Sequence, residues 1–353
     1  MTTAKRWKRH DTTAWRTARA RRRRTAALGA VPRGPLARGL LLVVILLLGG
    51  IAAWYLLGRG GGGLGVMGVF AGPEGPSYQS SIPDVGRPLA VASSPDGRLI
   101  YAGESDGRYA VRIFDRQGKD VGAIEAPEPL DYWLPINIAV ARTGEVYVVD
   151  GIVGGIHIFS AEGEFLRTMP PPEGLDVWSP TALAFDDVGN LYVTERFEWV
   201  SESRHRVLVF SPEGELLRQF GEKGAGLGKL NYPNGIAVDE QGRVYVTNMS
   251  GGVDVFTPEG QYITRIGTPQ GEQGVGLPRG LALDQDQRLY VVDITGQQVA
   301  VYDTGNDGFP LLYSFGSFGQ GGGEFRFPES VAVDATGRVY VADRVNNRVE
   351  IWS

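Results

Sequence analysis

Cysteine is missing from this sequence, and histidine is scarce, with His10, His157 and His205 as its three copies. Without cysteine the chain has no disulfides, no thiolate metal sites and no cysteine nucleophile. His157 is expected at an outward alternating position of a strand, and His205 at a turn. Because neither has a second histidine as a partner, the sequence predicts no histidine zinc site.

Two catalytic motifs are also absent. No glycine-rich phosphate loop leads from a strand into a helix, and no serine nucleophile elbow is present. Beyond residue 65 there is no helical apolar period, whereas the chain contains 51 glycines and 21 prolines. This composition is typical of a turn-rich all-β domain and gives no support to a P-loop or nucleophile-elbow enzyme.

Acidic residues are almost absent from residues 1–38, which carry twelve Lys or Arg and one acid, Asp11. Because this segment has few apolar residues to bury, we predict a disordered basic tail. The rest of the chain holds the acids that bring the net charge to −5. The run Arg21–Arg24 could bind nucleic acid. The uncharged segment that follows offers a better explanation, because basic residues beside a membrane span stay in the cytoplasm. We therefore predict no nucleic-acid partner.

Charge is absent altogether from residues 39–58, which read GLLLVVILLLGGIAAWYLLG. Twenty helical residues span about 30 Å, the thickness of the hydrocarbon core of a bilayer. We predict a single transmembrane signal-anchor helix with the basic tail in the cytoplasm and the rest of the chain outside it. A cleaved signal peptide is the alternative. Residues 59–65 are predicted to form a flexible glycine-rich linker.

One phrase recurs six times in residues 66–353. Its last copy reads PESVAVDATGRVYVAD from Pro328 and is followed by VEIW at Val349. Five further copies, which match this phrase closely or more loosely, begin at Gly86, Pro135, Pro180, Pro233 and Pro278. One tyrosine recurs in every copy, as Tyr101, Tyr147, Tyr192, Tyr245, Tyr290 and Tyr340. A period of about 45–50 residues indicates a propeller, a solenoid or another repeat array.

Each copy reads as four short strands, of the types IAVD, VYV, VxVF and ELLRQF, separated by glycine-containing turns. Four-stranded units arranged radially protect the edges of their sheets. The sequence therefore predicts an all-β fold, a six-bladed β-propeller with four-stranded blades over 66–353, preceded by one transmembrane helix. We expect this propeller to be monomeric.

The repeat resembles the NHL repeat, in which Pro-x-Gly-(Ile/Leu)-Ala-Val-Asp is followed by Gly-x-(Ile/Val)-Tyr-Val-(Ala/Thr)-Asp and by Asn-x-Arg-Val-x-(Ile/Val)-Phe. The copy at Pro328 matches best and includes Asn346-Asn347-Arg348. The resemblance covers about residues 66–353 and implies a propeller. It implies no single activity, because propellers host unrelated functions.

The last copy stops at Ser353 after its third strand, while Val66–Phe70 resembles a spare fourth strand. We therefore expect Val66–Phe70 to close the last blade. In such a ring, fourth-to-first and second-to-third strand loops share one face. The linker would enter on the other face, so the first face would point away from the membrane.

Variable residues concentrate on this expected membrane-distal face. The position after the repeat's proline holds Arg87, Ile136, Thr181, Asn234, Arg279 and Glu329, and should lie near the central channel. The second strands end in Glu104, Asp150, Glu195, Asn248, Asp293 and Asp343. We expect ion pairs for Asp343 with Arg348 and for Glu195 with Arg206, and no arginine partner for Glu104, Asp150 or Asp293.

Aromatic residues mark the loops of the same face. Trp133 and Trp178 follow a shared aromatic–acid pattern and are expected either to wedge between blades or to bind a ligand. Phe197 and Trp199 lie in a long second-to-third strand loop over 196–203, where aromatic residues often bind partners. With Arg87 and Arg279, these four residues form the predicted binding set.

The leading prediction is a membrane-tethered, extracytoplasmic recognition or scaffold propeller that binds a protein, peptide or glycan through its membrane-distal face, without a cofactor; the sequence favours a non-enzymatic role over an enzymatic one and leaves both open. Similar propellers include calcium-dependent lactonases, amidating lyases and antibiotic lyases. That resemblance leaves an alternative, a calcium-dependent hydrolase or lyase acting on a small molecule in the channel. Its metal ligands would be Glu329, Asn234, Asn248 and Asp293.

Overall fold

The structure is a computed structural model that describes residues 75–353 except 176, 200–201 and 269–273. These residues belong to one compact unit, 70–353. The predicted tail (1–38), membrane span (39–58) and linker (59–65) lie outside the described residues. In the part of the chain that is described, no helix is both long and apolar enough to cross a membrane.

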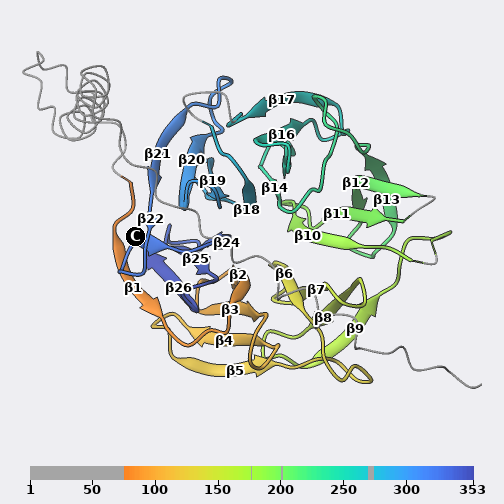
Figure 1. The fold of residues 1–353 in the computed structure, drawn as a ribbon. Helices are drawn as coiled ribbons and strands as arrows, with labels where there is room; N and C mark the ends of the chain where they lie inside the picture. The colour runs from red at the N-terminus through yellow and green to blue at the C-terminus, as the bar shows by residue number, and fades with distance from the viewer. Residues whose placement is uncertain (1–74, 176, 200–201, 269–273) are drawn as a thin grey trace, which may run out of the picture. The chain divides into compact units, whose positions relative to one another are not determined.

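The described residues form six antiparallel sheets of four strands each, arranged around a central axis, which confirms the predicted six-bladed propeller (Figure 1). In each of the first five blades the strands follow one another from the axis outward. Blades 1 to 3 comprise β2 (Pro88–Ser93), β3 (Leu99–Glu104), β4 (Val111–Asp115), β5 (Asp120–Ile124); β6 (Pro135–Val140), β7 (Val146–Asp150), β8 (Gly155–Phe159), β9 (Phe165–Met169); and β10 (Pro180–Phe185), β11 (Leu191–Glu198), β12 (Ser203–Phe210), β13 (Leu216–Phe220).

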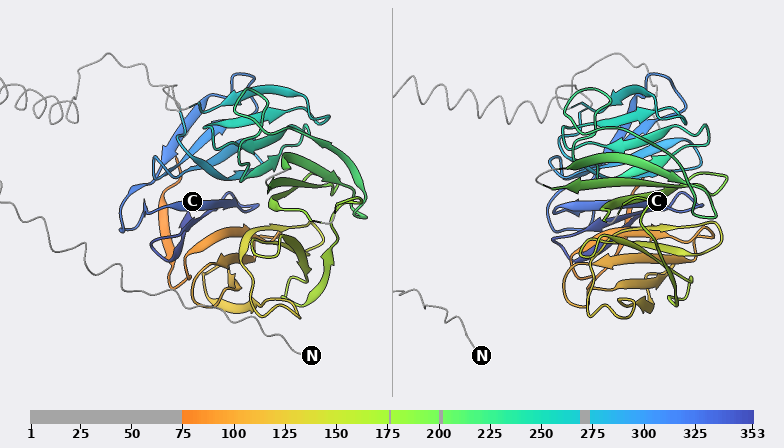
Figure 2. Two further views of the ribbon diagram at one scale, coloured as in Figure 1. Left: turned by 45° about the vertical axis from the view of Figure 1, so that its right-hand side comes forward. Right: turned by 90° about the vertical axis from the view of Figure 1, so that its right-hand side faces the viewer.

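The other three blades complete the ring. Blades 4 to 6 comprise β14 (Ile236–Val238), β15 (Val244–Thr247), β16 (Val253–Phe256), β17 (Tyr262–Ile266); β18 (Pro278–Leu283), β19 (Arg288–Asp293), β20 (Gln298–Asp303), β21 (Leu311–Phe315); and β24 (Pro328–Val333), β25 (Val339–Asp343), β26 (Arg348–Trp352), β1 (Tyr78–Ile82). A small parallel pair, β22 (Ser317–Phe318) and β23 (Glu324–Phe325), lies in the connection between blades 5 and 6. Each innermost strand contacts that of the next blade, and β24 contacts β2, so the ring is closed. Seen from the side, the loops of the propeller emerge on two opposite faces (Figure 2).

The recurring aspartate and tyrosine hold the turn between the first two strands of a blade. Asp334 accepts hydrogen bonds from the backbone N–H groups of Thr336 (2.8 Å) and Arg338 (3.1 Å) and from the hydroxyl of Tyr340 (2.9 Å). Asp239 makes the corresponding bonds in blade 4, including one from Tyr245 at 2.9 Å. The repeated phrase is thus the sequence of a side-chain-stabilised turn.

The apolar core lies between the blades rather than within them. The described residues form six buried apolar clusters, and each cluster joins two adjacent blades. The recurring tyrosines are buried in these clusters or beside them. Burial of this apolar surface is what favours the closed ring over separate sheets.

The N-terminal closure of the last blade is confirmed, but the strand that makes it is not Val66–Phe70. The outer strand of blade 6 is β1, which pairs with β26 from Tyr78 opposite Trp352 to Ile82 opposite Val349. Ser77 and Ser353 extend this pairing with two backbone hydrogen bonds, of 2.9 and 3.0 Å. Since β1 occupies the position, Val66–Phe70 cannot fill it, and that segment lies outside the described residues.

Candidate binding face and axial cavity

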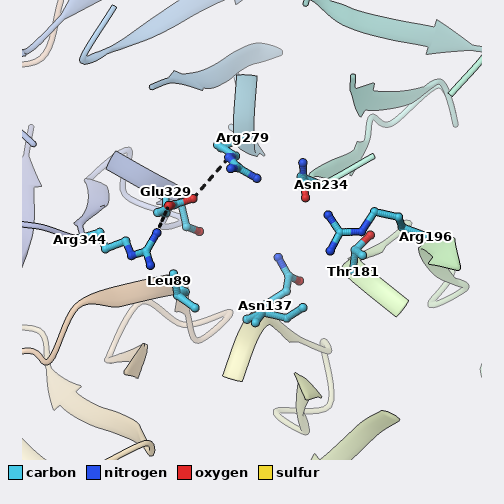
Figure 3. Close-up of a pocket in the computed structure, with 11 residues that line it drawn as sticks. Leu89, Asn137, Thr181, Arg196, Asn234, Arg279, Glu329 and Arg344 are labelled. Carbon is cyan, nitrogen blue, oxygen red and sulfur yellow. Dashed lines mark hydrogen bonds and ion pairs between the residues drawn. The ribbon is translucent and has the colours of Figure 1, made fainter. Parts of the chain in front are cut away.

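A polar cavity of about 260 Å³ opens at one mouth of the central channel (Figure 3). Its walls come from the first halves of the first strands, with Asn234 from just before β14, Arg196 from β11 and Arg344 from just after β25. The lining residues are Leu89, Ile136, Asn137, Thr181, Arg196, Asn234, Arg279, Gly280, Glu329, Ser330 and Arg344. Five of the six residues predicted at this place therefore line the cavity: Ile136, Thr181, Asn234, Arg279 and Glu329.

Arg87, the sixth residue predicted there, does not line the cavity, because it precedes Pro88; the residue that follows this proline is Leu89, which is part of the lining. The Arg87 side chain is exposed at the edge of the mouth, and its backbone N–H donates a hydrogen bond of 3.1 Å to Asn347. Arg87, Tyr232 and Phe327 each precede the proline of their repeat and have positive φ angles of 46°, 51° and 56°. Such angles are unfavourable for bulky residues and often mark functional sites, so this rim is conformationally constrained.

Positive charge dominates the cavity. Glu329 forms ion pairs with Arg344 at 3.0 Å and with Arg279 at 3.5 Å on one side of the cavity. Arg196 approaches from the opposite side (Figure 3). Its guanidinium stacks over the Tyr232 ring at 5.6 Å, and no carboxylate of the described residues pairs with it. Three guanidinium groups therefore face a single carboxylate.

Uncharged polar groups complete the walls. The Asn137 side-chain oxygen accepts a hydrogen bond of 3.0 Å from the Leu183 backbone, which leaves its amide N–H groups available. Asn234 donates through its amide to the Tyr232 carbonyl at 3.0 Å, which leaves its side-chain oxygen available. Leu89 and Ile136 add an apolar part to the lining. The cavity can thus receive a group with a negative end and a short apolar body.

The opposite mouth of the channel has the reverse charge. Its cavity, of about 540 Å³, is lined by six carboxylates, with Arg142 as the one basic residue among the described lining side chains: Asp186, Asp187, Asp239, Glu240, Asp284 and Asp334. Several of these carboxylates hold the first-to-second strand turns, as described for Asp239 and Asp334. We therefore assign them a structural role.

Exposed apolar side chains gather on the loops around the arginine-lined mouth. Antiparallel strands alternate in direction, so the second-to-third and fourth-to-first strand loops share this face. Eleven large, exposed apolar residues of the described chain lie in these loops: Tyr109, Tyr132, Ile152, Val153, Val177, Trp199, Leu227, Tyr232, Met249, Phe318 and Phe327. On the loops of the other face, Val188 is the only described residue of this kind. We call the arginine-lined side the cavity face.

Trp199 is the most exposed tryptophan described, at 70%, and lies in the short connection at the tip of the β11–β12 hairpin. The expected loop over 196–203 is largely strand, because β11 and β12 extend to Glu198 and Ser203. Beneath the tip, the Arg204 guanidinium covers the Phe197 ring at 4.1 Å. Phe197 is therefore half-buried and supports the hairpin that presents Trp199.

A polar cluster fixes the base of this hairpin. Glu198 accepts hydrogen bonds from Lys223 (2.6 Å) and Ser203 (2.6 Å) and lies 2.9 Å from His205 Nε2. The hydrogen bonds from Lys223 and Ser203 lower the pKa of Glu198 to about 2. Glu198 therefore remains ionised at physiological pH, and the cluster keeps its charge.

Trp133 and Trp178 are buried, at 0% and 4% exposure, in the clusters between blades 1 and 2 and between blades 2 and 3. Of the two roles expected for them, the structure favours the wedge between blades over an exposed anchor. The sequence of a single repeat does not show that these tryptophans are buried, because the residues that cover each indole ring include residues of the neighbouring blade.

Both histidines of the propeller are buried, which corrects the outward and turn positions predicted for them. His157 shares a hydrogen bond of 2.9 Å with Thr168, and its Nε2 lies 3.8 Å from Asp150. His205 lies in β12, and its Nδ1 is 3.2 Å from the Leu230 carbonyl oxygen. Burial lowers the pKa of His205, so its neutral form is favoured.

The acids that end the second strands are structural. The predicted ion pairs Asp343–Arg348 (3.0 Å) and Glu195–Arg206 (2.6 Å) are present. The prediction that Glu104 lacks an arginine partner is wrong, because Arg112 lies 3.1 Å from it.

Asp150 and Asp293 have backbone partners in place of an arginine. Asp150 accepts hydrogen bonds from the N–H groups of Leu134 and Ile152, and Asp293 accepts them from Leu277 and Thr295. One oxygen of each carboxylate is therefore engaged by the backbone of its own blade, while Asp150 Oδ2 is buried 3.8 Å from His157 Nε2 without a hydrogen bond in the described structure.

The residues expected to hold calcium are not brought together. Glu329 and Asn234 line the cavity, but Asn248 is buried and bonds to Asp254 and to the Lys229 carbonyl oxygen. Asp293 is engaged by the backbone groups just described. Arg279 and Arg344 form ion pairs with the carboxylate of Glu329, and their positive charges would repel a cation bound beside it. The described donor set does not fit calcium.

Arg196 and Arg344 were not identified from the sequence as cavity residues. A signal was present, since each directly follows the polar residue expected at the end of a second strand, Glu195 in blade 3 and Asp343 in blade 6. In the other four repeats this position holds Ser105, Gly151, Met249 and Ile294. Arg196 and Arg344 are thus the two arginines at this repeat position, and both line the cavity.

Comparisons with known proteins agree with the repeat and the fold. The NHL repeat model matches residues 325–352, and a β-propeller repeat model matches residues 217–252. NHL repeat-containing protein 3 of mouse is 32% identical over 165 residues, and that of human is 30% identical over 168 residues. Each match covers 42% of this chain and 45% of the relative, so the chain spans less than half the length of these relatives.

Solved structures with the same fold include two enzymes. A gluconolactonase from Xanthomonas campestris is 18% identical, with a TM-score of 0.59 over 79% of this chain and 94% of that chain. A streptogramin B lyase is 13% identical, with a TM-score of 0.55 over 78% and 96%. A Bacteroides thetaiotaomicron protein of unknown function is 15% identical, with a TM-score of 0.61 over 79% and 72%. At these identities the likeness shows the fold alone.

Proposed function

We propose that this chain, a six-bladed β-propeller built from NHL repeats, is a recognition module that binds a protein or peptide partner through its cavity face. The observation that carries the proposal is the unequal distribution of exposed apolar side chains, eleven on the loops of this face and Val188 alone on those of the other, among the described residues. Apolar groups concentrated on one face of a rigid scaffold mark interaction sites.

The kinds of exposed residue favour a protein partner over a glycan. Ile152, Val153, Leu227 and Met249 are flexible or branched apolar side chains, which suit the apolar surface of a protein. Trp199 and Tyr132 add aromatic anchors of the kind that contribute most of the binding free energy in interfaces. The cavity supplies charged groups at the centre of this apolar surface.

We further propose that residues 39–58 tether the propeller to a membrane, with the propeller outside the cytoplasm. The described chain enters β1 at Tyr78, at the strand end opposite the cavity face, because β1 is a fourth strand and leads into the loop before β2. A tether attached there leaves the cavity face accessible. A reporter fused after Ser353 should be active only outside the cytoplasm, and activity of a cytoplasm-only reporter there would reject the tether.

The experiment compares variants on the two faces for capture of a partner from solubilised membranes. Trp199→Ala removes an exposed side chain at a hairpin tip, so the melting temperature should stay nearly unchanged while partner capture weakens at least tenfold. Glu213→Lys and Glu259→Lys change turns of the opposite face and should leave capture intact. Loss of capture in the glutamate variants together with full capture by Trp199→Ala would show that the wrong face was assigned.

A further inference from the structure

We infer that the axial cavity binds a carboxylate group, presented by an acidic side chain of the partner segment that covers the cavity face. The assignment of the partner rests on the proposed function, whereas the assignment of an anionic ligand rests on the cavity alone. The cavity holds the guanidinium groups of Arg196, Arg279 and Arg344 and a single carboxylate, Glu329. Its net positive charge favours an anion at the position that the three arginines face (Figure 3).

The arginines keep unused donors. Arg196 has only the stacking contact with Tyr232, and no carboxylate of the described chain pairs with it. The Nε atoms of Arg279 and Arg344 are buried and lack a hydrogen-bond acceptor in the described structure. Arg279 Nε lies 3.5 Å from Glu329, which is an ion pair but not a hydrogen bond. A buried donor without an acceptor is costly, and a bound carboxylate would supply oxygens that guanidinium groups recognise well.

Glu329 offsets part of the positive charge of this site. It holds Arg344 at 3.0 Å and Arg279 at 3.5 Å, and so keeps two like charges close together before a ligand arrives. It cannot neutralise the cavity, because Arg196 lies on the opposite side (Figure 3). The remaining charge is available to a ligand, and removing the charge of Glu329 should increase it.

The size and apolar wall of the cavity fit an acidic side chain. A volume of about 260 Å³ accommodates more than an isolated carboxylate, given that one water occupies about 30 Å³ in the liquid. Leu89 and Ile136 offer an apolar surface for the methylene groups that carry the carboxylate. The Asn137 amide adds a neutral donor beside them. The arrangement therefore favours an aspartate or glutamate side chain over a small inorganic anion.

The test is calorimetric titration of the purified full-length chain with glutarate and, separately, with inorganic phosphate, each at low and equal ionic strength. We expect glutarate to bind more tightly than phosphate. Its affinity should fall at least tenfold in Arg196→Gln, a variant that loses only a stacking contact within the protein, and should decrease as salt is added. Glu329→Gln should bind glutarate severalfold more tightly, because the net positive charge increases.

Arg98→Gln is the matched control, because it removes one exposed arginine in a turn of the opposite face and gives the same change in net charge. Its affinity for glutarate should equal that of the unmodified chain. Undetectable binding of both probes, or equal affinity of the unmodified chain and Arg196→Gln, overturns the anion site. Weaker binding by Glu329→Gln overturns it as well, since that is the behaviour of a cation site.

Binding of phosphate in preference to glutarate overturns the assignment of an acidic side chain. Since neither probe requires the protein partner, these outcomes are independent of the capture experiment. Glutarate binding with unchanged capture by Trp199→Ala would reject the proposed partner contacts and retain the anion site.

Discussion

Among single residues, Glu350 is the most unusual acid of the described propeller. It lies in β26 with 0% exposure, one Glu350 oxygen lies 2.7 Å from Arg348, and its Oε2 has no hydrogen-bond partner in the described structure. Burial raises the pKa of Glu350 to about 7, while the attraction of Arg348 opposes the increase. An acid with a raised pKa in the folded state favours folding only while it stays protonated.

We predict that Glu350 makes the propeller less stable as the pH rises from about 4.5 to 7. In that window the folded chain retains a proton that the unfolded chain has released, so the free energy of unfolding decreases with pH. Above pH 7 the carboxyl of Glu350 is ionised in both states, and the free energy of unfolding is then lower than at acidic pH by about 3 kcal/mol. Glu350→Gln should remove this slope and raise the melting temperature at pH 8 by several degrees, as measured by calorimetry. Glu213→Gln, on an exposed turn, is the control, and parallel pH profiles for both variants would disprove the role of Glu350.

Among the elements, β1 decides whether the ring is closed. It supplies the outer strand of blade 6, and Ile82 at its end is buried against the cluster between blades 1 and 6. β1 is separated by 265 residues or more from the strand that it pairs with, as Ile82 opposite Val349 and Tyr78 opposite Trp352 show. Such a long-range pairing holds together the two ends of a ring that otherwise opens.

A chain that begins at Pro83 should melt at a lower temperature than one that begins at Gly75. The shorter chain loses β1 and the burial of Ile82, a change comparable to truncating a core isoleucine, which costs about 2–5 kcal/mol. The melting temperature should therefore fall by at least about 4 °C, because about 1 kcal/mol corresponds to 2–4 °C in a large domain. Equal melting temperatures for the two chains would rule out β1 as the closing strand.

The sequence identified the architecture because the repeat encodes its own turns. Four copies carry the turn aspartate, and in three of them, Asp239, Asp284 and Asp334, it accepts a hydrogen bond from the recurring tyrosine. The tyrosine itself recurs in all six copies, and six copies predict six blades. The closing strand was misplaced for a physical reason. An outer strand of this kind buries little, and YQSSI buries only Ile82, so it lacks the apolar pattern that made Val66–Phe70 attractive.

The candidate site was predicted in part. The residues after the repeat's proline line the cavity because the first strands surround the axis, a placement that the topology alone determines. The burial of Trp133 and Trp178 depends on the adjacent blade, and the hairpin of Trp199 depends on cross-strand pairing over 196–205. Tertiary packing of this kind leaves no local pattern in the sequence.

At the scale of the whole propeller, its two faces differ in both charge and polarity. The cavity face combines an arginine-lined mouth with a surrounding set of exposed apolar side chains, and the opposite mouth is lined by carboxylates. A molecule with this polarity orients an approaching acidic partner toward one face, since complementary potentials guide encounter before contact. The first strand of the described chain, β1, starts on the other face, so the tether that we propose would not compete with binding.

The most direct measurement of the central claim is site-specific cross-linking in intact cells. A photoreactive amino acid replaces Trp199 on the cavity face in one strain and Glu213 on the opposite face in another. We predict discrete partner adducts from position 199 and none from position 213, with the adducts at 199 reduced at least tenfold when Arg196→Gln is added. Adducts that form at position 213 but not at 199 would contradict the account.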